Sequence, residues 1–312
     1  EFPGCEENVV IEIDREKNKF SMSLKKTVVD GEPENANEMN IEEAKKIKKS
    51  AKVGGEVLVK LSPAMFGRVS AGAAKQSLRN DIKDFERNQF VEQYKSKVDD
   101  IISARITKID SVSGIATLQL DKNEIYLFKN EQIPGEELSE GEIIKVYVME
   151  IINPDKKPAI KISRAHKNLV KRLFELEIPE IYDGTVEVKA ISREAGSRTK
   201  VAVCSNDENV DAIGACIGPK RSRITRIVEE LDGEKIDIIP YSENDSEFIA
   251  SALAPAEVIS VTLSEEEDVR ACTVVVPNNQ LSLAIGNKGQ NAKLAAKLTG
   301  YKIDIKPENE TL

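Results

Sequence analysis

The sequence has no tryptophan and few aromatic residues of any kind, which limits the cores that it can build. Aromatic residues make up 4% of the 312 residues, whereas apolar residues make up 40%. This composition supports folded domains, but it favours several small aliphatic cores over one large core. At about 100–200 residues per domain, the length allows two to four domains.

Histidine and cysteine are too few and too scattered to predict a metal site. The only histidine is His166, and the four cysteines form no C-x-x-C pair (Cys5, Cys204, Cys216, Cys272). Zinc sites combine closely spaced cysteine and histidine ligands, so we expect no metal here. Scattered cysteines also favour a reducing compartment over a disulfide framework. We expect the last three cysteines to be buried and unreactive, and His166 to lie at a domain junction.

Long apolar runs are absent as well. No run approaches the roughly 18 residues that a membrane span needs, and no signal-peptide pattern opens the chain. We therefore expect a cytoplasmic protein with no membrane partner. The formal net charge of −9 argues against nucleic-acid binding by the chain as a whole, because such proteins usually carry a basic surface. The local distribution of charge has to decide that question.

The first 97 residues combine short strands with one long helix. Residues 9–13 and 19–29 read as paired strands, 41–47 as a short helix and 57–59 as another strand. Ser62 and Pro63 are a favourable helix start, and apolar residues then recur at helical spacing to about Lys97. We expect this helix to pack its apolar face on its own domain; docking on a partner protein is the alternative.

From residue 98 the apolar residues alternate with polar ones in five short segments. They cover residues 102–109, 115–120, 125–128, 143–148 and 159–162, with turn residues between them. Five short strands in about 65 residues favour an OB-fold barrel. Arg105, Lys108, Tyr126 and Phe128 are its candidate RNA-binding residues, through phosphate contacts and base stacking. Alternatively, the two aromatic residues belong to the barrel core.

Two further blocks of the sequence resemble each other. Ile217-Gly218 matches Ile285-Gly286 at an offset of 68 residues, and the string KIDI at 235–238 recurs at 302–305, at an offset of 67. Each block reads as helix, strand, strand, helix, glycine-containing loop, helix, strand. A tandem duplication explains this pattern better than chance.

The loop of the second block has the composition of a phosphate clamp. Gly286-Asn287-Lys288-Gly289 precedes a predicted helix that carries Lys293 and Lys297 four residues apart on one face. Glycines at both ends let a phosphate backbone approach the main chain, while the amides and dipole of the helix N-terminus favour the negative charge. This is the GXXG arrangement by which KH domains hold about four nucleotides.

The first block has the related loop Gly218-Pro219-Lys220-Arg221, followed by Arg223 and Arg226. Arg221 stands where the second loop has glycine. Either Arg221 adopts a positive φ, at a cost of roughly 1 kcal/mol or more, or the loop has another shape and Arg221 contacts phosphate directly. No acidic residue lies between Gly218 and Val228 or between Gly286 and Lys302. The acidic average therefore conceals two basic segments.

Four strings resemble the NusA family of bacterial transcription factors. They are IPGE at 133–136, GACIG at 214–218, GEKIDII at 233–239 and LAIGNKGQNAKLAAKLTG at 283–300. The resemblance covers nearly the whole chain and implies a multidomain α+β fold. Its expected parts are an N-terminal α/β region of the polymerase-binding type with a long helix (1–97, lacking its usual start), an OB-fold RNA-binding domain of the ribosomal-protein-S-one type (98–164), and two tandem type II KH domains (165–243 and 244–312).

The resemblance also implies a function. Members of the family bind RNA polymerase and single-stranded nascent RNA, and they modulate pausing, termination and antitermination. Other elongation or antitermination factors are further expected partners, and we expect a monomer without a cofactor. No Walker loop or nucleophile elbow is present, so we expect no enzyme activity. Two alternatives stay open: an accessory subunit of an RNA-processing or degradation assembly, and a protein adaptor whose basic loops are incidental.

Overall fold

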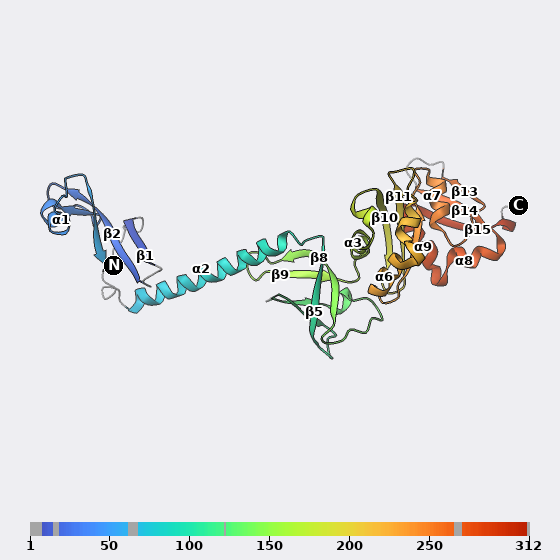
Figure 1. Ribbon diagram of the computed structural model, residues 1–312, viewed down its shortest axis with the longest axis horizontal. Coiled ribbons are helices and arrows are strands. Elements are labelled where there is room, and N and C mark those ends of the chain that lie inside the picture. Colours follow the sequence, from blue (N-terminus) through green and yellow to red (C-terminus); the bar gives the residue numbers. More distant parts are fainter. Residues whose placement is uncertain (1–7, 15–18, 62–67, 122, 265–269, 311–312) are drawn as a thin grey trace. The chain divides into compact units, whose positions relative to one another are not determined.

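The computed structural model describes residues 8–14, 19–61, 68–121, 123–264 and 270–310. The chain divides into two compact units, Glu1–Phe85 and Glu86–Leu312, which are described separately (Figure 1). The predicted helix start at Ser62-Pro63 lies outside the described residues.

The N-terminal unit contains a four-stranded sheet in which β2 (Lys19–Val29) is the common partner. It pairs with β1 (Val9–Asp14) and β4 (Glu56–Leu61) in antiparallel and with β3 (Glu38–Asn40) in parallel. Helix α1 (Ile41–Ile47) follows β3 and is capped by Asn40. A small aliphatic core lies between the helix and the sheet. The predicted strands and short helix are confirmed; β3, with three residues, had not been predicted.

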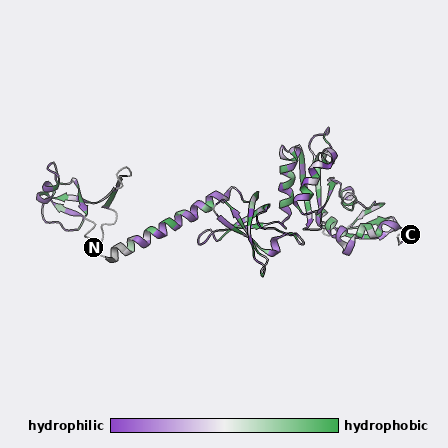
Figure 2. Ribbon diagram, turned by 60° about the horizontal axis from the view of Figure 1, so that its bottom comes forward, coloured by the Kyte–Doolittle hydropathy of each residue, from purple (hydrophilic) through white to green (hydrophobic). Residues whose placement is uncertain are grey.

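Helix α2 (Arg68–Lys95) begins in the first unit and ends in the second. Leu78, Ile82 and Phe85 are 62%, 57% and 68% exposed, so the prediction that the apolar face packs on its own domain is wrong for this stretch. Figure 2 shows mostly hydrophilic residues along α2. Within the second unit, Tyr94 is fully buried against the following barrel, and its hydroxyl accepts a hydrogen bond from Asn123 at 3.0 Å.

The second unit opens with a five-stranded antiparallel sheet. Its spatial order is β7-β6-β5-β8-β9, and β7 lies against β9, so the sheet nearly closes into a barrel. Alternate residues of each strand fill an aliphatic core, as the sequence pattern predicted. The strands are β5 (Ile101–Ile109), β6 (Ala116–Leu120), β7 (Asn123–Leu127), β8 (Ile143–Ile152) and β9 (Ala159–Ser163).

The first KH domain follows the barrel. Its central strand β11 pairs with β10 in antiparallel and with β12 in parallel. Helix α3 ends before Pro179, which occupies the first turn of a second short helix, where its missing N–H costs little. The elements are α3 (Lys167–Glu177), α4 (Pro179–Tyr182), β10 (Val186–Glu194), β11 (Arg198–Ser205), α5 (Ala212–Ile217), α6 (Ser222–Glu230) and β12 (Lys235–Pro240).

The second KH domain repeats this arrangement. Strand β14 pairs with β13 in antiparallel and with β15 in parallel. Apart from the additional helix α4 of the first domain, the order of elements and the strand pairing are the same, which confirms the internal duplication. The elements are α7 (Asp245–Ala252), β13 (Ser260–Leu263), β14 (Ala271–Val276), α8 (Leu281–Ile285), α9 (Gln290–Thr299) and β15 (Lys302–Pro307).

A buried arginine joins the barrel to the first KH domain. Arg164 is 2% exposed, forms ion pairs with Glu136 of the barrel and Glu230 of α6, and donates a hydrogen bond to the Lys145 carbonyl at 2.6 Å. Removing one partner of such a buried ion pair typically costs several kcal/mol. The junction is therefore fixed by charge as well as by apolar packing.

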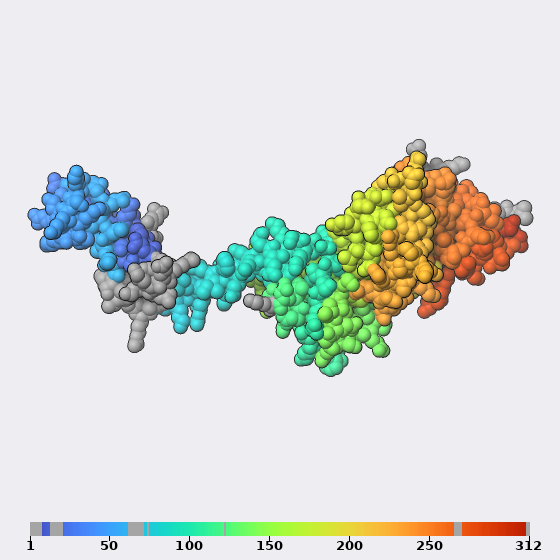
Figure 3. All heavy atoms as spheres, in the orientation of Figure 1, coloured from blue at the N-terminus to red at the C-terminus, as the bar shows by residue number. Residues whose placement is uncertain are grey.

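The two KH domains share one hydrophobic core. Ala202 and Ile239 of the first domain pack in the same cluster as residues of α7 and α9. Lys200 is fully buried, with Nζ 3.1 Å from Asp237 Oδ2, and it donates a hydrogen bond to the Ala254 carbonyl of the second domain at 2.7 Å. Figure 3 shows the atoms of the two domains packed against each other.

Candidate nucleic-acid interface

The two glycine-containing loops have the same backbone conformation. Gly218 has φ 71° and ψ 172°, and Gly286 has 75° and 174°. Lys220 has φ 51° and ψ 31°, and Lys288 has φ 53° and ψ 26°. Each loop is a 3₁₀ turn that leads directly into a helix, α6 or α9. The structure thus reproduces in both copies the loop-to-helix geometry that the sequence predicted.

Arg221 adopts the left-handed conformation that glycine adopts in the second loop. Its φ and ψ are 63° and 19°, against 75° and 15° for Gly289. The structure therefore shows the positive φ at Arg221, and the first loop keeps the shape of the second. For a residue with a side chain this conformation costs roughly 1–2 kcal/mol.

The first glycine of each loop is required by close packing as well as by its φ. A Cβ added to Gly286 would lie 2.8 Å from both the backbone nitrogen and the Cβ of Asn291. A Cβ on Gly218 would lie 2.6 Å from Cγ of Arg223. Gly289 differs, because a Cβ there would have only the Lys293 Cε within 4 Å, at 3.8 Å. The space beside this fourth position is therefore open.

Arg223 and Asn291 occupy equivalent positions, just inside the helix after each loop. Arg223 donates hydrogen bonds to the Ala215 carbonyl at 2.6 Å and to Glu180 Oε2 at 2.7 Å. Asn291 is 3% exposed and donates to the carbonyls of Ala284 and Leu253, each at 3.0 Å. Arg223 thus ties its loop to α5 and α4, and Asn291 ties its loop to α8 and to the residue that follows α7. The ion pair of Arg223 with Glu180 favours a structural role for Arg223 in holding the loop, and RNA contact by this residue stays a prediction.

The remaining predicted cations lie at the surface. Arg226 is 69% exposed and lies 3.4 Å from Glu177. The others form no ion pair with any residue in the described part of the chain, namely Lys220, Arg221, Lys288, Lys293 and Lys297. Pro219 and Asn287 are exposed within the two loops. Each loop thus presents unpaired positive charge at the N-terminus of a helix, the end that attracts anions.

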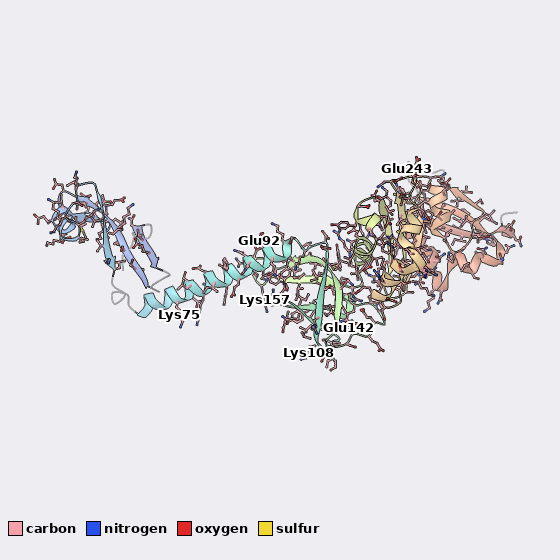
Figure 4. All side chains as sticks on the ribbon, viewed as in Figure 1. Lys75, Glu92, Lys108, Glu142, Lys157 and Glu243 are labelled. Atoms are coloured by element: carbon pink, nitrogen blue, oxygen red, sulfur yellow. The ribbon has the colours of Figure 1, made fainter. Side chains whose placement is uncertain are left out.

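The barrel carries its predicted residues on its outer surface. Tyr126 and Phe128 are 47% and 48% exposed, so the alternative that they belong to the core is wrong. The strand register places Lys108 opposite Thr117, and Thr117 opposite Tyr126, in one row across β5, β6 and β7. Arg105 and Lys108 are exposed, and Figure 4 shows Lys108 at the barrel surface. Exposed aromatic rings and exposed cations on the surface of one sheet suit base stacking and phosphate contact.

Models of three protein domain families match the chain. The NusA N-terminal domain matches residues 2–88, the NusA-like first KH domain residues 164–241, and the NusA-like second KH domain residues 245–312. The transcription termination/antitermination protein NusA of Bacillus subtilis is 44% identical over 304 residues, which cover 97% of this chain and 81% of that protein. The chain belongs to the NusA family.

Other relatives of this NusA chain carry the same name. NusA of Halalkalibacterium halodurans is 43% identical, covering 97% of this chain and 78% of that protein. NusA of Thermus thermophilus is 40% identical, covering 95% and 76%. These proteins are named as regulatory factors and not as enzymes. The predicted membership of the NusA family and the multidomain α+β fold are therefore confirmed, and the names support the expectation that the chain is not an enzyme.

The predictions about metal ligands, apolar helices, cysteines and His166 can be compared with the described part of this NusA chain. No group of three or more potential metal ligands lies together there, and no helix among those residues has the length and apolarity to cross a membrane. Burial raises the pKa of the Cys216 thiol to about 12 and that of Cys272 to about 11, which makes both poor nucleophiles. His166 caps α3 and stacks on Tyr147 at the junction between the barrel and the first KH domain.

Several residues that shape the interface in this NusA chain were missed by sequence reasoning. Gln290, directly after the second loop, donates a hydrogen bond to Ser197 in the β10–β11 turn of the first domain at 2.7 Å. Lys200 is a buried polar residue whose two hydrogen-bond partners lie 37 and 54 positions away in the sequence. Asn291 is also buried, and its two partners lie 7 and 38 positions away. A lysine opening the apolar run Lys200–Val203 was the one available signal, because a buried lysine requires a partner.

Proposed function

We propose that this NusA-family chain is an RNA-binding transcription elongation factor that associates with RNA polymerase and with single-stranded nascent RNA, and so modulates pausing, termination and antitermination. The observation that carries the RNA-binding part is the pair of loops with matching backbone conformation. Each places main-chain amides, a helix N-terminus and unpaired cations at one surface point.

This arrangement supports a particular way of holding RNA. The open space beside Gly289 lets a phosphate approach the main chain of loop 286–289, while three lysines supply positive charge around it (Lys288, Lys293 and Lys297). Bases of an extended strand then stay free to stack on exposed rings, such as Tyr126 of the barrel. A duplex offers no unstacked bases, so single-stranded RNA is the ligand that we propose.

The exposed apolar stripe on α2 supports the polymerase part of the proposal. Leu78, Ile82 and Phe85 recur at helical spacing on one face and are more than half exposed. Such a stripe is typical of a helix that docks on a protein partner. Ile82→Glu should weaken binding to purified bacterial RNA polymerase at least tenfold, while Asn80→Glu, with the same added charge on the opposite helix face, should not. Equal loss in the two variants would contradict docking through this stripe.

The RNA part is tested by fluorescence anisotropy on the full chain across a salt series. Wild type should bind labelled single-stranded RNA with an affinity that falls as salt rises, because phosphate contacts release counterions. Gly289→Asp should lose most of this binding, since it adds both a side chain and a negative charge at the open position.

The matched control is Gly300→Asp, at the other end of helix α9. Gly300 has φ 78°, so the new aspartate there suffers the same backbone strain without touching the loop. This control should bind RNA as wild type does. If Gly289→Asp also keeps wild-type affinity, the glycines only make a turn and the protein-adaptor alternative gains weight.

A further inference from the structure

At their fourth position the two loops have the same backbone conformation but different residues, Arg221 in the first loop and Gly289 in the second. Arg221 and Gly289 differ by 12° in φ and 4° in ψ, and each N–H donates to the carbonyl of the first glycine of its loop at 3.1 Å. The second loop forms this turn with no side chain at all. The side chain of Arg221 is therefore not needed to shape the first loop.

The surroundings of the two positions indicate what the arginine changes. A side chain on Gly289 would enter open space, with only the end of Lys293 within 4 Å of its Cβ. Because the loops share their conformation, the arginine occupies the corresponding space in the first loop. At the second loop a phosphate can approach the main chain directly. A phosphate that approaches the first loop in the same way would contact the Arg221 guanidinium before the main chain.

Among the described residues, no partner of the Arg221 side chain explains why an arginine stands at this position. Arg221 is exposed, and its side chain makes no hydrogen bond or ion pair with any of the residues that the structure describes. The next cations along α6 are paired, Arg223 with Glu180 and Arg226 with Glu177. Lys220 and Arg221 are thus the free charges of the first loop.

We propose that Arg221 converts the first loop into a side-chain phosphate contact, so that the two KH domains hold RNA in different ways. The guanidinium binds phosphate with two parallel hydrogen bonds at the first loop, whereas main-chain amides bind it at the second. This inference rests on the proposed RNA-binding function. It assigns the first domain a contact that depends on charge and the second a contact that depends on close approach.

The test compares Arg221→Gly, Arg221→Lys and wild type, as full chains, on labelled single-stranded RNA across a salt series. Arg221→Gly should bind roughly tenfold more weakly at low salt, as expected for one lost charged contact. Its slope of log affinity against log salt should fall by about 0.7, the value for one phosphate on a single strand. Arg221→Lys should keep the slope and lose part of the affinity, because a lysine cannot bind in a bidentate manner.

Two controls separate binding from folding and from general charge. Arg221→Gly should melt at the wild-type temperature or above it, since glycine relieves the left-handed strain. Lys46→Ala removes one exposed charge from α1 of the N-terminal unit and should leave both affinity and slope unchanged.

The outcomes distinguish this inference from the function on which it rests. If wild type binds RNA and Arg221→Gly binds equally well or more tightly with the same slope, the arginine contact is overturned while RNA binding stands. If wild type itself fails to bind single-stranded RNA at low salt, the proposed function is overturned and the inference with it.

Discussion

Arg223 of the first KH domain and Asn291 of the second are chemically different side chains that hold their loops by the same type of hydrogen bond. Each donates to a carbonyl of the helix before the loop, Ala215 for the arginine and Ala284 for the asparagine. Only the arginine carries a charge, and Glu180 neutralises that charge 2.7 Å away. Position within the repeat, and not charge, indicates what Arg223 does.

Arg223→Ala should therefore lower stability without removing a phosphate contact. The substitution leaves the Ala215 carbonyl and the Glu180 carboxylate without this donor, and we expect a loss of about 1–3 kcal/mol in the free energy of unfolding. Lys220→Ala should do the reverse, with unchanged stability and a salt slope for RNA binding lower by about 0.7. Denaturant titration and anisotropy on both variants check this pair. A lowered slope for Arg223→Ala would show that its guanidinium contacts RNA after all.

The two glycines of the second loop should tolerate alanine to different degrees. Gly286→Ala places a Cβ 2.8 Å from the backbone nitrogen of Asn291, which cannot move without disturbing the start of α9. Gly289→Ala meets open space and suffers only the left-handed strain, roughly 1 kcal/mol. We expect Gly286→Ala to cost at least about 1 kcal/mol more, because overpacking adds to the same strain. Thermal melts of both variants measure the difference, and equal melting temperatures would contradict it.

The contact between the two KH domains should weaken in acid. Burial alone would raise the pKa of the Asp237 carboxyl, but the hydrogen bond from Arg198 and the charge of Lys200 lower it below its ordinary value of 3.8. A depressed folded-state pKa stabilises the protein above about pH 3.8, and this stabilisation is lost as the pH falls through the folded-state value. The acid limb of stability should therefore steepen below pH 3.8.

Asp237→Asn should remove that steepening and cost about 1.5–3 kcal/mol at pH 7, since a charged hydrogen bond is lost. The control is Asp304→Asn, at the equivalent residue of the second domain, whose carboxylate is 67% exposed and lies 3.7 Å from Lys306. It should follow the wild-type curve in urea titrations from pH 7 to pH 2.5. If both variants follow the same curve, Asp237 does not stabilise the domain contact.

The barrel should contribute to RNA binding through its exposed rings. Tyr126→Ala and Phe128→Ala should each weaken binding to single-stranded RNA by about 1–3 kcal/mol, the value of one stacked base. Neither should change the salt slope, because no charge is removed. Val112→Ala is the control, since Val112 is 96% exposed on the same barrel. Anisotropy on an RNA long enough to cover the unit checks this, and wild-type affinity in both aromatic variants would exclude the barrel face.

The sequence predicted the elements whose pattern is long enough to read. Alternation over 102–109 and 143–148 identified barrel strands, and the repeat identified both KH domains. Strand β3 was missed because three residues cannot display a period, and its pairing depends on β2.

The sequence predicted which residues belong to the candidate site better than it predicted what each residue does there. The loops and their cations follow from local spacing, so the sequence identified them. The partner of Arg223 lies 43 residues upstream, and that of Lys200 lies in the next domain, so neither pairing is visible along the chain. The exposed face of α2 was misjudged because amphipathic spacing shows that a helix has an apolar face but not what covers it.

The shared core of the KH domains fixes the distance between their two glycine-containing loops. Lys200, Ala202 and Gln290 fix the second domain on the first, so the distance between loops 218–221 and 286–289 cannot adjust to the ligand. An RNA that is too short to reach both loops gains no affinity from the second loop. An RNA that just spans both loops binds the second one intramolecularly, at an effective concentration in the millimolar range. Affinity for single-stranded RNA should therefore rise in a step at the strand length that just spans both loops.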